Sequence, residues 1–205
     1  MNEYQPGNPV ILRMLQSGSF DTAITEDILN DVDLNAPIYD ERGYITTYLN
    51  EAVCSSNLQA VKYLFDHGAN PNYNDEDLSC CPLWELQFLY DESTETQYEI
   101  EKLFFKYGAD PNLVCEGEGL YDAVVYSVYN DLPSHKAERK HLLQFYKLLV
   151  LYGGGGLENG YGKPSIENID INCADDYHIE LYRCDDGYHI TGWLVDKGGN
   201  KIAEL

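Results

Sequence analysis

Apolar residues recur along most of the chain at the three- and four-residue spacing of amphipathic helices, and polar or glycine-rich turns separate the runs. Proline in a first helical turn favours starts at Pro9 and Pro82. Two capping boxes, with Ser or Thr three residues before Gln, favour starts at 56–59 and 94–97. The pattern predicts helices over residues 8–15, 21–30, 47–53, 56–67, 81–86, 94–107, 120–129 and 134–152.

The ending of one predicted helix recurs in a second. The two segments are Leu64-Phe65-Asp66-His67-Gly68-Ala69-Asn70-Pro71-Asn72 and Phe104-Phe105-Lys106-Tyr107-Gly108-Ala109-Asp110-Pro111-Asn112. In each, a glycine that is free to adopt positive φ ends the helix, and a proline three residues later prevents it from resuming. Weaker versions follow at Asp31 and Gly153, so a helix-loop unit occurs about four times.

This unit resembles the ankyrin repeat, in which a β-turn and two antiparallel helices recur about every 33 residues. The family's Thr-Pro-Leu-His-x-Ala opening is partly present as Thr47-Tyr48-Leu49-Asn50-Glu51-Ala52 and Cys81-Pro82-Leu83-Trp84, and its Gly-Ala-Asp-x-Asn ending is the repeated segment. The resemblance covers roughly residues 8 to 156. It implies a mainly α fold, an ankyrin-like α-solenoid of about four helix pairs. Phe65 and Phe104 would then fill the space between layers.

After the last glycine run the apolar period changes to two. Residues 157–172 have no helical period, which predicts a linker. Alternating residues then predict strands over 179–184, 188–195 and 201–205, joined by turns at 185–187 and 196–200. We therefore expect a repeat array over 1–156, a linker over 157–172 and a small antiparallel β tail over 173–205. A sheet of this size is marginal alone, so we expect it to pack on the last repeat.

Charge bears on the partner more than on the fold. The 205 residues include 13 Lys and Arg against 35 Asp and Glu, giving a net charge of −22. Such a chain repels nucleic acid and anionic membranes and attracts basic proteins. The alternative is that the acidity serves only solubility. Without an apolar run of membrane-spanning length or a signal-peptide pattern at the start, we expect a cytoplasmic monomer.

Candidate catalytic chemistry is weak. The six cysteines include no Cys-x-x-Cys pair, and the five histidines include no helical zinc motif. The glycine run at 153–156 does not make a phosphate loop with Gly162 and Lys163, because Leu157 stands where a Gly is required and Pro164 where Ser or Thr is required. Carboxylates are so numerous that a pair at glycosidase separation would arise by chance. We predict no metal, no cofactor and no enzyme activity, and a carboxylate-based enzyme is the weakest alternative.

Acidic turns occupy equivalent places in successive units. Stacked units would place these carboxylates along one edge beside aromatic residues, which suits a basic protein partner. The alternative is that turns are simply polar. The candidate partner-binding residues, on turn tips and inner helices, are Tyr39, Asp40, Glu41, Tyr73, Asp75, Glu76, Asp77, Trp84, Glu116, Glu118 and Tyr121.

These features predict a non-enzymatic protein-binding module with an acidic face. A short, acidic, ankyrin-like chain is similar to immunity proteins of bacterial toxin systems. That resemblance implies an inhibitor that covers the active site of a basic toxin, often a nuclease. The alternative is an adaptor or scaffold whose acidity serves only solubility.

Overall fold

The computed structural model describes residues 4–29, 32–75, 80–88, 94–130, 134–155, 171–184 and 190–205. The fold is mainly α, as predicted. The chain divides into two compact units, one of Met1–Leu89 with Glu95–Ala109 and the other of Tyr90–Thr94 with Asp110–Leu205. The predicted stop at Asp31, the turn at 185–187 and the linker up to residue 170 lie outside the described residues.

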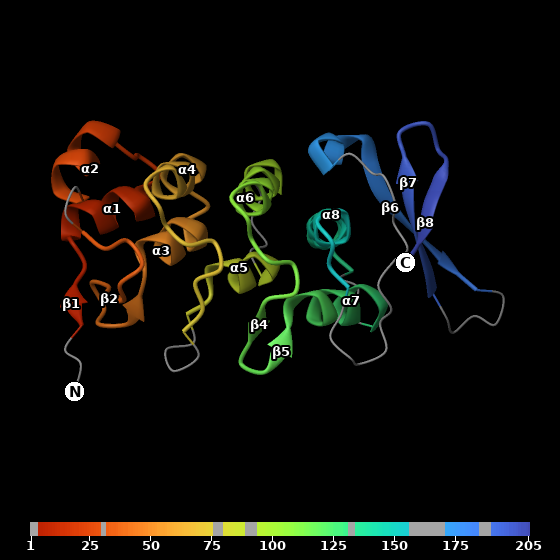
Figure 1. The fold of residues 1–205 in the computed structure, drawn as a ribbon, viewed down its shortest axis with the longest axis horizontal. Helices are drawn as coiled ribbons and strands as arrows, with labels where there is room; N and C mark the ends of the chain where they lie inside the picture. The colour runs from red at the N-terminus through yellow and green to blue at the C-terminus, as the bar shows by residue number, and fades with distance from the viewer. Residues whose placement is uncertain are drawn as a thin grey trace. The chain divides into compact units, whose positions relative to one another are not determined.

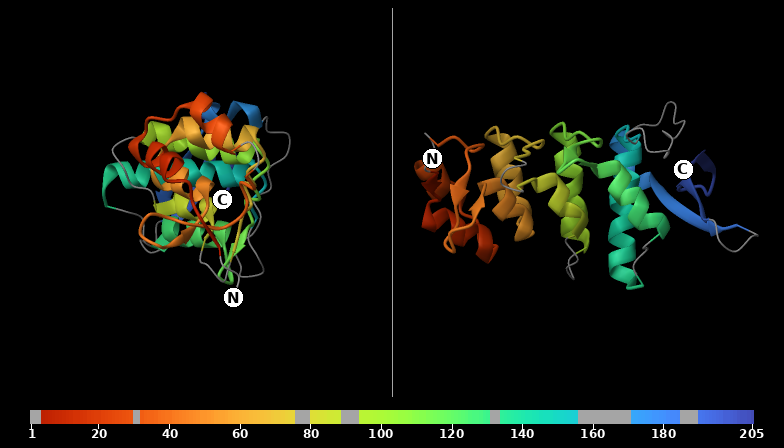
Figure 2. Two further views of the ribbon diagram at one scale, coloured as in Figure 1. Left: turned by 90° about the vertical axis from the view of Figure 1, so that its left-hand side faces the viewer. Right: turned by 90° about the horizontal axis from the view of Figure 1, so that it is seen from below.

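Helix pairs build the first unit. α1 contacts α3, and α3 in turn contacts α4 and α5. Figures 1 and 2 show α1, α3 and α5 following one another in one row, with α2, α4 and α6 in a second row beside it. The helices are α1 (Pro9–Ser17), α2 (Thr22–Leu29), α3 (Tyr48–Cys54), α4 (Leu58–Asp66), α5 (Pro82–Glu85), which continues as the 3-10 helix η1 (Leu86–Phe88), and α6 (Thr94–Lys106).

The start of α4 differs from the predicted capping box by one residue. The cap is Asn57, whose Oδ1 accepts a hydrogen bond from the Ala60 amide at 3.2 Å. Ser56 has φ of 51° in the tight turn after α3, so it belongs to the turn. The side-chain amide of Asn57 also donates, through Nδ2, to the Leu15 carbonyl at the end of α1, at 3.2 Å. Asn57 therefore caps its own helix and joins it to the preceding pair.

The predicted helix stops are confirmed at three glycines. Gly68, Gly108 and Gly153 have φ of 92°, 89° and 91°. In the first stop, the Gly68 amide donates to Phe65 and the Ala69 amide to Leu64, a Schellman motif. The same pair of bonds closes the helices before Gly108 and Gly153. An L-residue with a side chain is strained at this φ, which explains the glycine.

Phe65 and Phe104 share one core in the first unit, as predicted. Their side chains are 4% and 0% exposed. The ring centroids lie 4.9 Å apart with the planes at 88°, the edge-to-face arrangement that aromatic pairs prefer. Since Phe65 belongs to α4 and Phe104 to α6, this contact ties one helix pair to the next.

Two asparagines of the first unit, Asn35 and Asn72, bond to the glycine stop of the next helix pair. The Asn35 side chain donates to the Gly68 carbonyl at 3.2 Å and accepts from the Asn70 amide at 2.7 Å. The Asn72 side chain donates to the Gly108 carbonyl at 2.9 Å. These bonds satisfy backbone groups that the helix ends leave without intrahelical partners.

In the second unit, the Asn112 side chain plays the same part. Its Oδ1 accepts from the Gly155 amide at 2.9 Å. Each of these asparagines is oriented by a residue two positions earlier, whose side-chain oxygen accepts a hydrogen bond from the backbone amide of the asparagine. The pairs are Asp33 with Asn35, Asn70 with Asn72 and Asp110 with Asn112, at 3.0, 2.9 and 2.9 Å.

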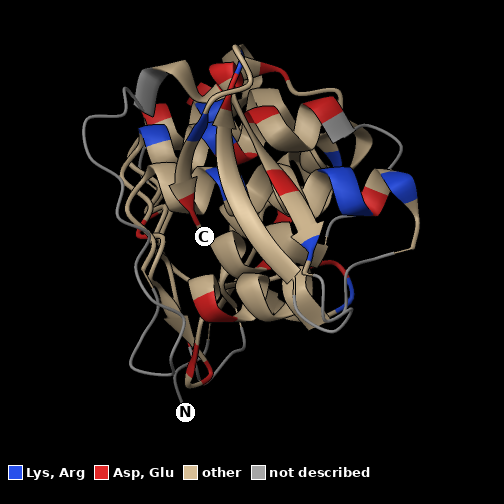
Figure 3. Ribbon diagram, turned by 90° about the vertical axis from the view of Figure 1, so that its right-hand side faces the viewer, with Lys and Arg blue, Asp and Glu red and all other residues tan. Residues whose placement is uncertain are grey.

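The second unit combines a helix pair with the predicted antiparallel sheet. The strands run in the order β6-β7-β8, and β6 contacts α8. Figure 3 looks onto this sheet. Gly192 of β7 lies so close to the Tyr129 hydroxyl of α7 that a Cβ at Gly192 would overlap it. The elements are α7 (Leu120–Asn130), α8 (Lys136–Leu151), η2 (Ile171–Asp176), β6 (Tyr177–Arg183), β7 (Ile190–Asp196) and β8 (Lys201–Glu204).

One basic residue of the sheet is held by aromatic rings. The Lys201 ammonium lies 4.2 Å from the Tyr182 ring centroid and 4.7 Å from that of Trp193. These cation–π contacts join β8 across β7 to β6. Lys201 therefore connects the three strands of the sheet through its contacts with Tyr182 and Trp193.

We predict that Phe104→Ala lowers the free energy of unfolding by about 3–5 kcal/mol, because it leaves a cavity against Phe65. The same substitution at Phe88, which is 54% exposed, is the matched control and should change it by less than about 0.5 kcal/mol. Urea denaturation measures both. Equal effects at the two positions would contradict the shared core.

Asn35→Ala should lower the free energy of unfolding by about 1 kcal/mol, since it removes two hydrogen bonds between successive helix pairs. Gln59 is exposed on α4 and its side chain makes no hydrogen bond among the described residues, so Gln59→Ala serves as the control. Chemical denaturation of both variants tests whether these two bonds join the helix pairs. A loss of unfolding free energy in Asn35→Ala no greater than that in Gln59→Ala would rule this out.

Candidate partner-binding surface

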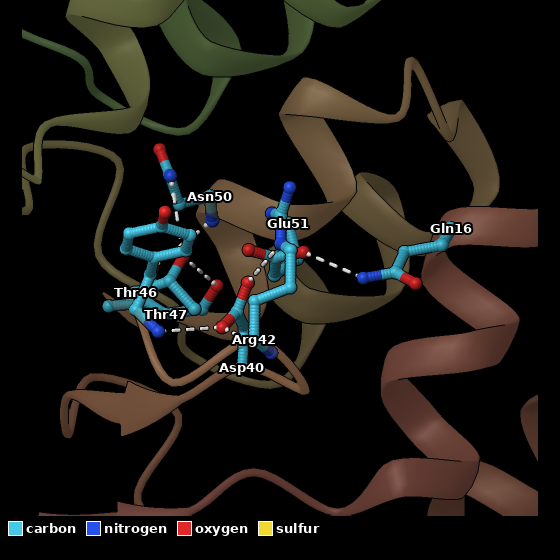
Figure 4. Close-up of polar contacts among 8 residues, drawn as sticks. Gln16, Asp40, Arg42, Thr46, Thr47, Asn50 and Glu51 are labelled. Carbon is cyan, nitrogen blue, oxygen red and sulfur yellow. Dashed lines mark hydrogen bonds and ion pairs between the residues drawn. The ribbon is translucent and has the colours of Figure 1, made fainter.

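The first acidic turn links two short strands that the sequence did not predict, β2 (Ile38–Tyr39) and β3 (Ile45–Thr46). Asp40 follows β2, and its side chain is only 1% exposed. Its Oδ1 accepts from the backbone amides of Arg42 and Tyr44 at 2.9 and 2.7 Å, and its Oδ2 binds the Arg42 Nε at 2.9 Å (Figure 4). The expectation that Asp40 faces a partner is therefore wrong, because the turn itself uses the carboxylate.

The electrostatics of Asp40 agree with this structural role. Burial alone would raise its pKa, but the hydrogen bonds from the Tyr44 and Arg42 amides and the Arg42 guanidinium outweigh burial and lower it. Arg42 is in turn occupied by Asp40, and its guanidinium carbon lies 5.4 Å from the Tyr44 ring centroid. The turn is thus built around one internal ion pair.

Other predicted residues of the first unit lie nearer to solvent. Glu41 is exposed, and its ion pair with Arg13 spans 3.1 Å between largely solvated side chains. A pair of this kind contributes little to stability, so Glu41 is available to a partner. Tyr39 is half-buried, with its ring centroid 6.1 Å from that of Tyr4.

Tyr73 and Asp75 mark the next turn and are both half-buried. The pKa of Tyr73 is raised to about 12, first by burial and then by nearby groups that include Asp75, to which it is hydrogen-bonded. Asp75 pairs with Cys80 in an isolated β-bridge. Glu76 and Asp77 lie outside the described residues. Trp84 of α5 is half-buried.

The remaining predicted residues belong to the second unit. Glu116 and Glu118 are exposed around the hairpin of β4 (Val114–Cys115) and β5 (Glu118–Gly119). Tyr121 is only 2% exposed, so its predicted partner contact is wrong. It already lies inside α7, where its ring centroid is 5.9 Å from that of Tyr146. The adjacent Gly154 leaves the ring room, since a Cβ there would overlap it.

Two aromatic residues that the sequence did not single out are more exposed than those it did. Tyr44 is 67% exposed at the tip of the first turn, and Phe88 is 54% exposed at the end of η1. Tyr44 follows Gly43, whose φ of 84° fits a turn tip. The position of Tyr44 directly after this glycine was the sequence feature that could have indicated its exposure. Exposed aromatic side chains of this size are frequent anchors in protein interfaces.

A pocket of ≈ 420 Å³ opens beside the first turn. Glu51 of α3 lies in it and is 8% exposed, and its Oε2 accepts from the Gln16 amide at 3.2 Å (Figure 4). The sequence offered no sign of this pocket, because it forms only when α1, α3 and the turn meet. Its lining comprises Gln16, Glu41, Arg42, Glu51, Cys54 and Ser55.

Neither cysteine near this surface is poised as a nucleophile. The pKa of Cys54 is raised to about 12 by burial and by the charges of Glu85 and Glu51. That of Cys80 is raised to about 11, mainly by burial. Both thiols therefore stay protonated near neutral pH, whereas reactive cysteines need the thiolate.

Within the described ranges, no group of His, Cys, Asp and Glu side chains is arranged to hold a metal ion. Over the same ranges, none of the helices has the length and apolar character needed to cross a membrane. Searches against protein-family models and against curated proteins give no match.

We predict that Asp40→Asn weakens the loss of stability at acidic pH. The folded-state pKa of Asp40 lies below the ordinary value of 3.8, so the unfolded chain binds the proton more tightly. The carboxylate thus stabilises the fold at neutral pH, and that contribution is lost as the pH falls from about 4 through the lower folded-state pKa.

Unfolding free energies measured from about pH 6 to about pH 3 should therefore fall less steeply in Asp40→Asn than in the unmodified chain. Asp27, which is exposed on α2, provides the control substitution Asp27→Asn. A slope unchanged in Asp40→Asn would show that the turn does not depend on the charge.

Proposed function

We propose that the chain is a non-enzymatic protein-binding module, built as an ankyrin-like α-solenoid, whose acidic face binds a basic protein. The observation that carries the proposal is a net charge of −22 combined with exposed carboxylates at turn tips, Glu41, Glu116 and Glu118. Exposed aromatic side chains at Tyr44 and Phe88 add anchors of the kind that protein interfaces use.

The repeated joints support the solenoid. The same glycine stop closes three helices, and the asparagine that follows a stop bonds to the next stop in both units. A helix pair of this size cannot bury its apolar face alone, so its neighbour completes its core. Such arrays present turn tips and inner helices as an extended surface.

The most specific form of the proposal is an immunity or inhibitor protein that neutralises a basic, nuclease-like toxin in the cytoplasm. A nuclease that binds phosphate backbones carries a basic surface, and an acidic face can cover it by charge complementarity. Strongly opposite charges also accelerate association, which suits a protein that must capture a toxin before it acts. The alternative is an adaptor whose acidity serves only solubility.

The decisive variant neutralises three predicted turn carboxylates through Asp75→Asn, Glu116→Gln and Glu118→Gln. The control variant makes the same change in net charge on the helices α2 and α6, through Glu26→Gln, Asp27→Asn and Glu95→Gln at exposed positions. The protein partner is the product of the neighbouring reading frame, or a basic protein purified by capture on the intact chain.

We expect the turn variant to bind at least about tenfold more slowly than the control variant and to show a weaker dependence on salt. Stopped-flow or surface-binding kinetics over a salt series measures both quantities. Equal kinetics for the two variants would favour the adaptor. A neutral or acidic partner, or an association rate that does not change with salt concentration, would refute the acidic-face proposal.

A further inference from the structure

The pocket beside the first turn contains a glutamate that the fold leaves without a cation. Glu51 is 8% exposed, yet it receives only one hydrogen bond, from the neutral amide of Gln16 to Oε2. Among the described residues, nothing donates to its Oε1. An ionised carboxylate that is nine-tenths buried normally has a cation or several donors, so this one is incompletely satisfied.

Neither of the two nearby arginines forms an ion pair with Glu51. The Arg42 Nε binds Asp40 at 2.9 Å, and the Arg13 Nε lies 3.1 Å from Glu41 in a pair between solvated side chains. Arg42 lines the pocket and acts on Glu51 only through space. Figure 4 shows Glu51 between Gln16 of α1 and the turn that carries Asp40 and Arg42. The pocket therefore keeps a negative charge that its own residues do not pair.

A second carboxylate extends the same electrostatic environment. Glu85 of α5 is half-buried, makes no ion pair among the described residues, and has a pKa raised by desolvation. Glu85 and Glu51 both act on the Cys54 thiol, which lines the pocket and whose pKa they help to raise. Glu51 thus lies in the pocket, whereas Glu85 is not part of its lining and adds negative charge that reaches the pocket at Cys54.

We propose that this pocket receives a single cationic side chain, the guanidinium of an arginine or the ammonium of a lysine, from the protein partner. The pocket of ≈ 420 Å³ accommodates such a group. Glu51 Oε1 accepts from the cation, and the Gln16 side-chain oxygen offers a second acceptor because its amide nitrogen already donates to Glu51. The protein source of the cation rests on the proposed function, whereas the pocket's preference for a cation does not.

Three short peptides test the pocket directly: acetyl-Gly-Arg-Gly-amide, acetyl-Gly-Lys-Gly-amide, and the citrulline analogue of the first, which keeps its shape without the charge. Carboxyl-carbon NMR of the full chain follows Glu51 and Glu85 during titration. We expect millimolar binding of the cationic peptides, at least about fivefold weaker binding of citrulline, and a lowered pKa of Glu85 in the bound state.

Glu51→Gln separates binding from a structural role. The substitution should weaken the binding of the cationic peptides at least about fivefold. It should leave the midpoint of urea denaturation unchanged or raise it, because it removes a buried charge that no cation pairs. The control Glu26→Gln, at an exposed position of α2, should change neither property. Equal binding of citrulline, unchanged binding by Glu51→Gln, or a lowered midpoint would each overturn the proposal.

The outcome is distinct from that of the proposed function. If a basic partner binds through the turn carboxylates and is indifferent to Glu51→Gln, only the pocket proposal fails. If the peptides bind as expected but no basic protein partner is found, the pocket stands and the proposed function fails.

Discussion

Within the first unit, successive helix pairs are joined by bonds between an asparagine side chain and the glycine stop of the next pair, and a bond of the same kind recurs inside the second unit. A glycine at positive φ reverses the chain at the end of a helix, and the reversal exposes carbonyl and amide groups that the helix no longer satisfies. Asn35 and Asn72 bond to the Gly68 and Gly108 carbonyls in the first unit, and Asn112 accepts from Gly155 in the second. The polar joint and the apolar contact of Phe65 with Phe104 are thus made by the same neighbours.

The first acidic turn decides which of its own carboxylates remain available to a partner. The short hairpin of β2 and β3 needs acceptors for its own amides. Asp40 fills that need in the first turn, and its charge is balanced internally by Arg42. Glu41 lies one residue further along and has no such task, so it points to solvent. Adjacent acidic residues in one turn therefore have opposite roles.

The sequence predicted the parts of the fold that depend on local chemistry. The glycine stops and the strands of the tail follow from residue type and period alone, whereas the shared core of the two phenylalanines was expected from the stacking of repeated helix pairs. The cap of α4 was misplaced by one residue, since Ser56 and Asn57 are both good capping residues and only the turn geometry selects between them. Local pattern is therefore a good guide to where elements end and a poorer guide to which side chain closes them.

The candidate surface was less predictable, because exposure is a property of the packed chain. Tyr121 lies on the helix that the sequence predicted over 120–129, but packing turns its ring toward Tyr146 instead of the acidic edge. Glu51 and Asp40 are both buried, yet the fold supplies two backbone amides and a guanidinium to Asp40 and a single side-chain amide to Glu51. A buried carboxylate with its donors supplied stabilises the chain that contains it, whereas one without them costs stability until a cation arrives. The difference between these two residues is what separates a structural charge from one that is free to bind.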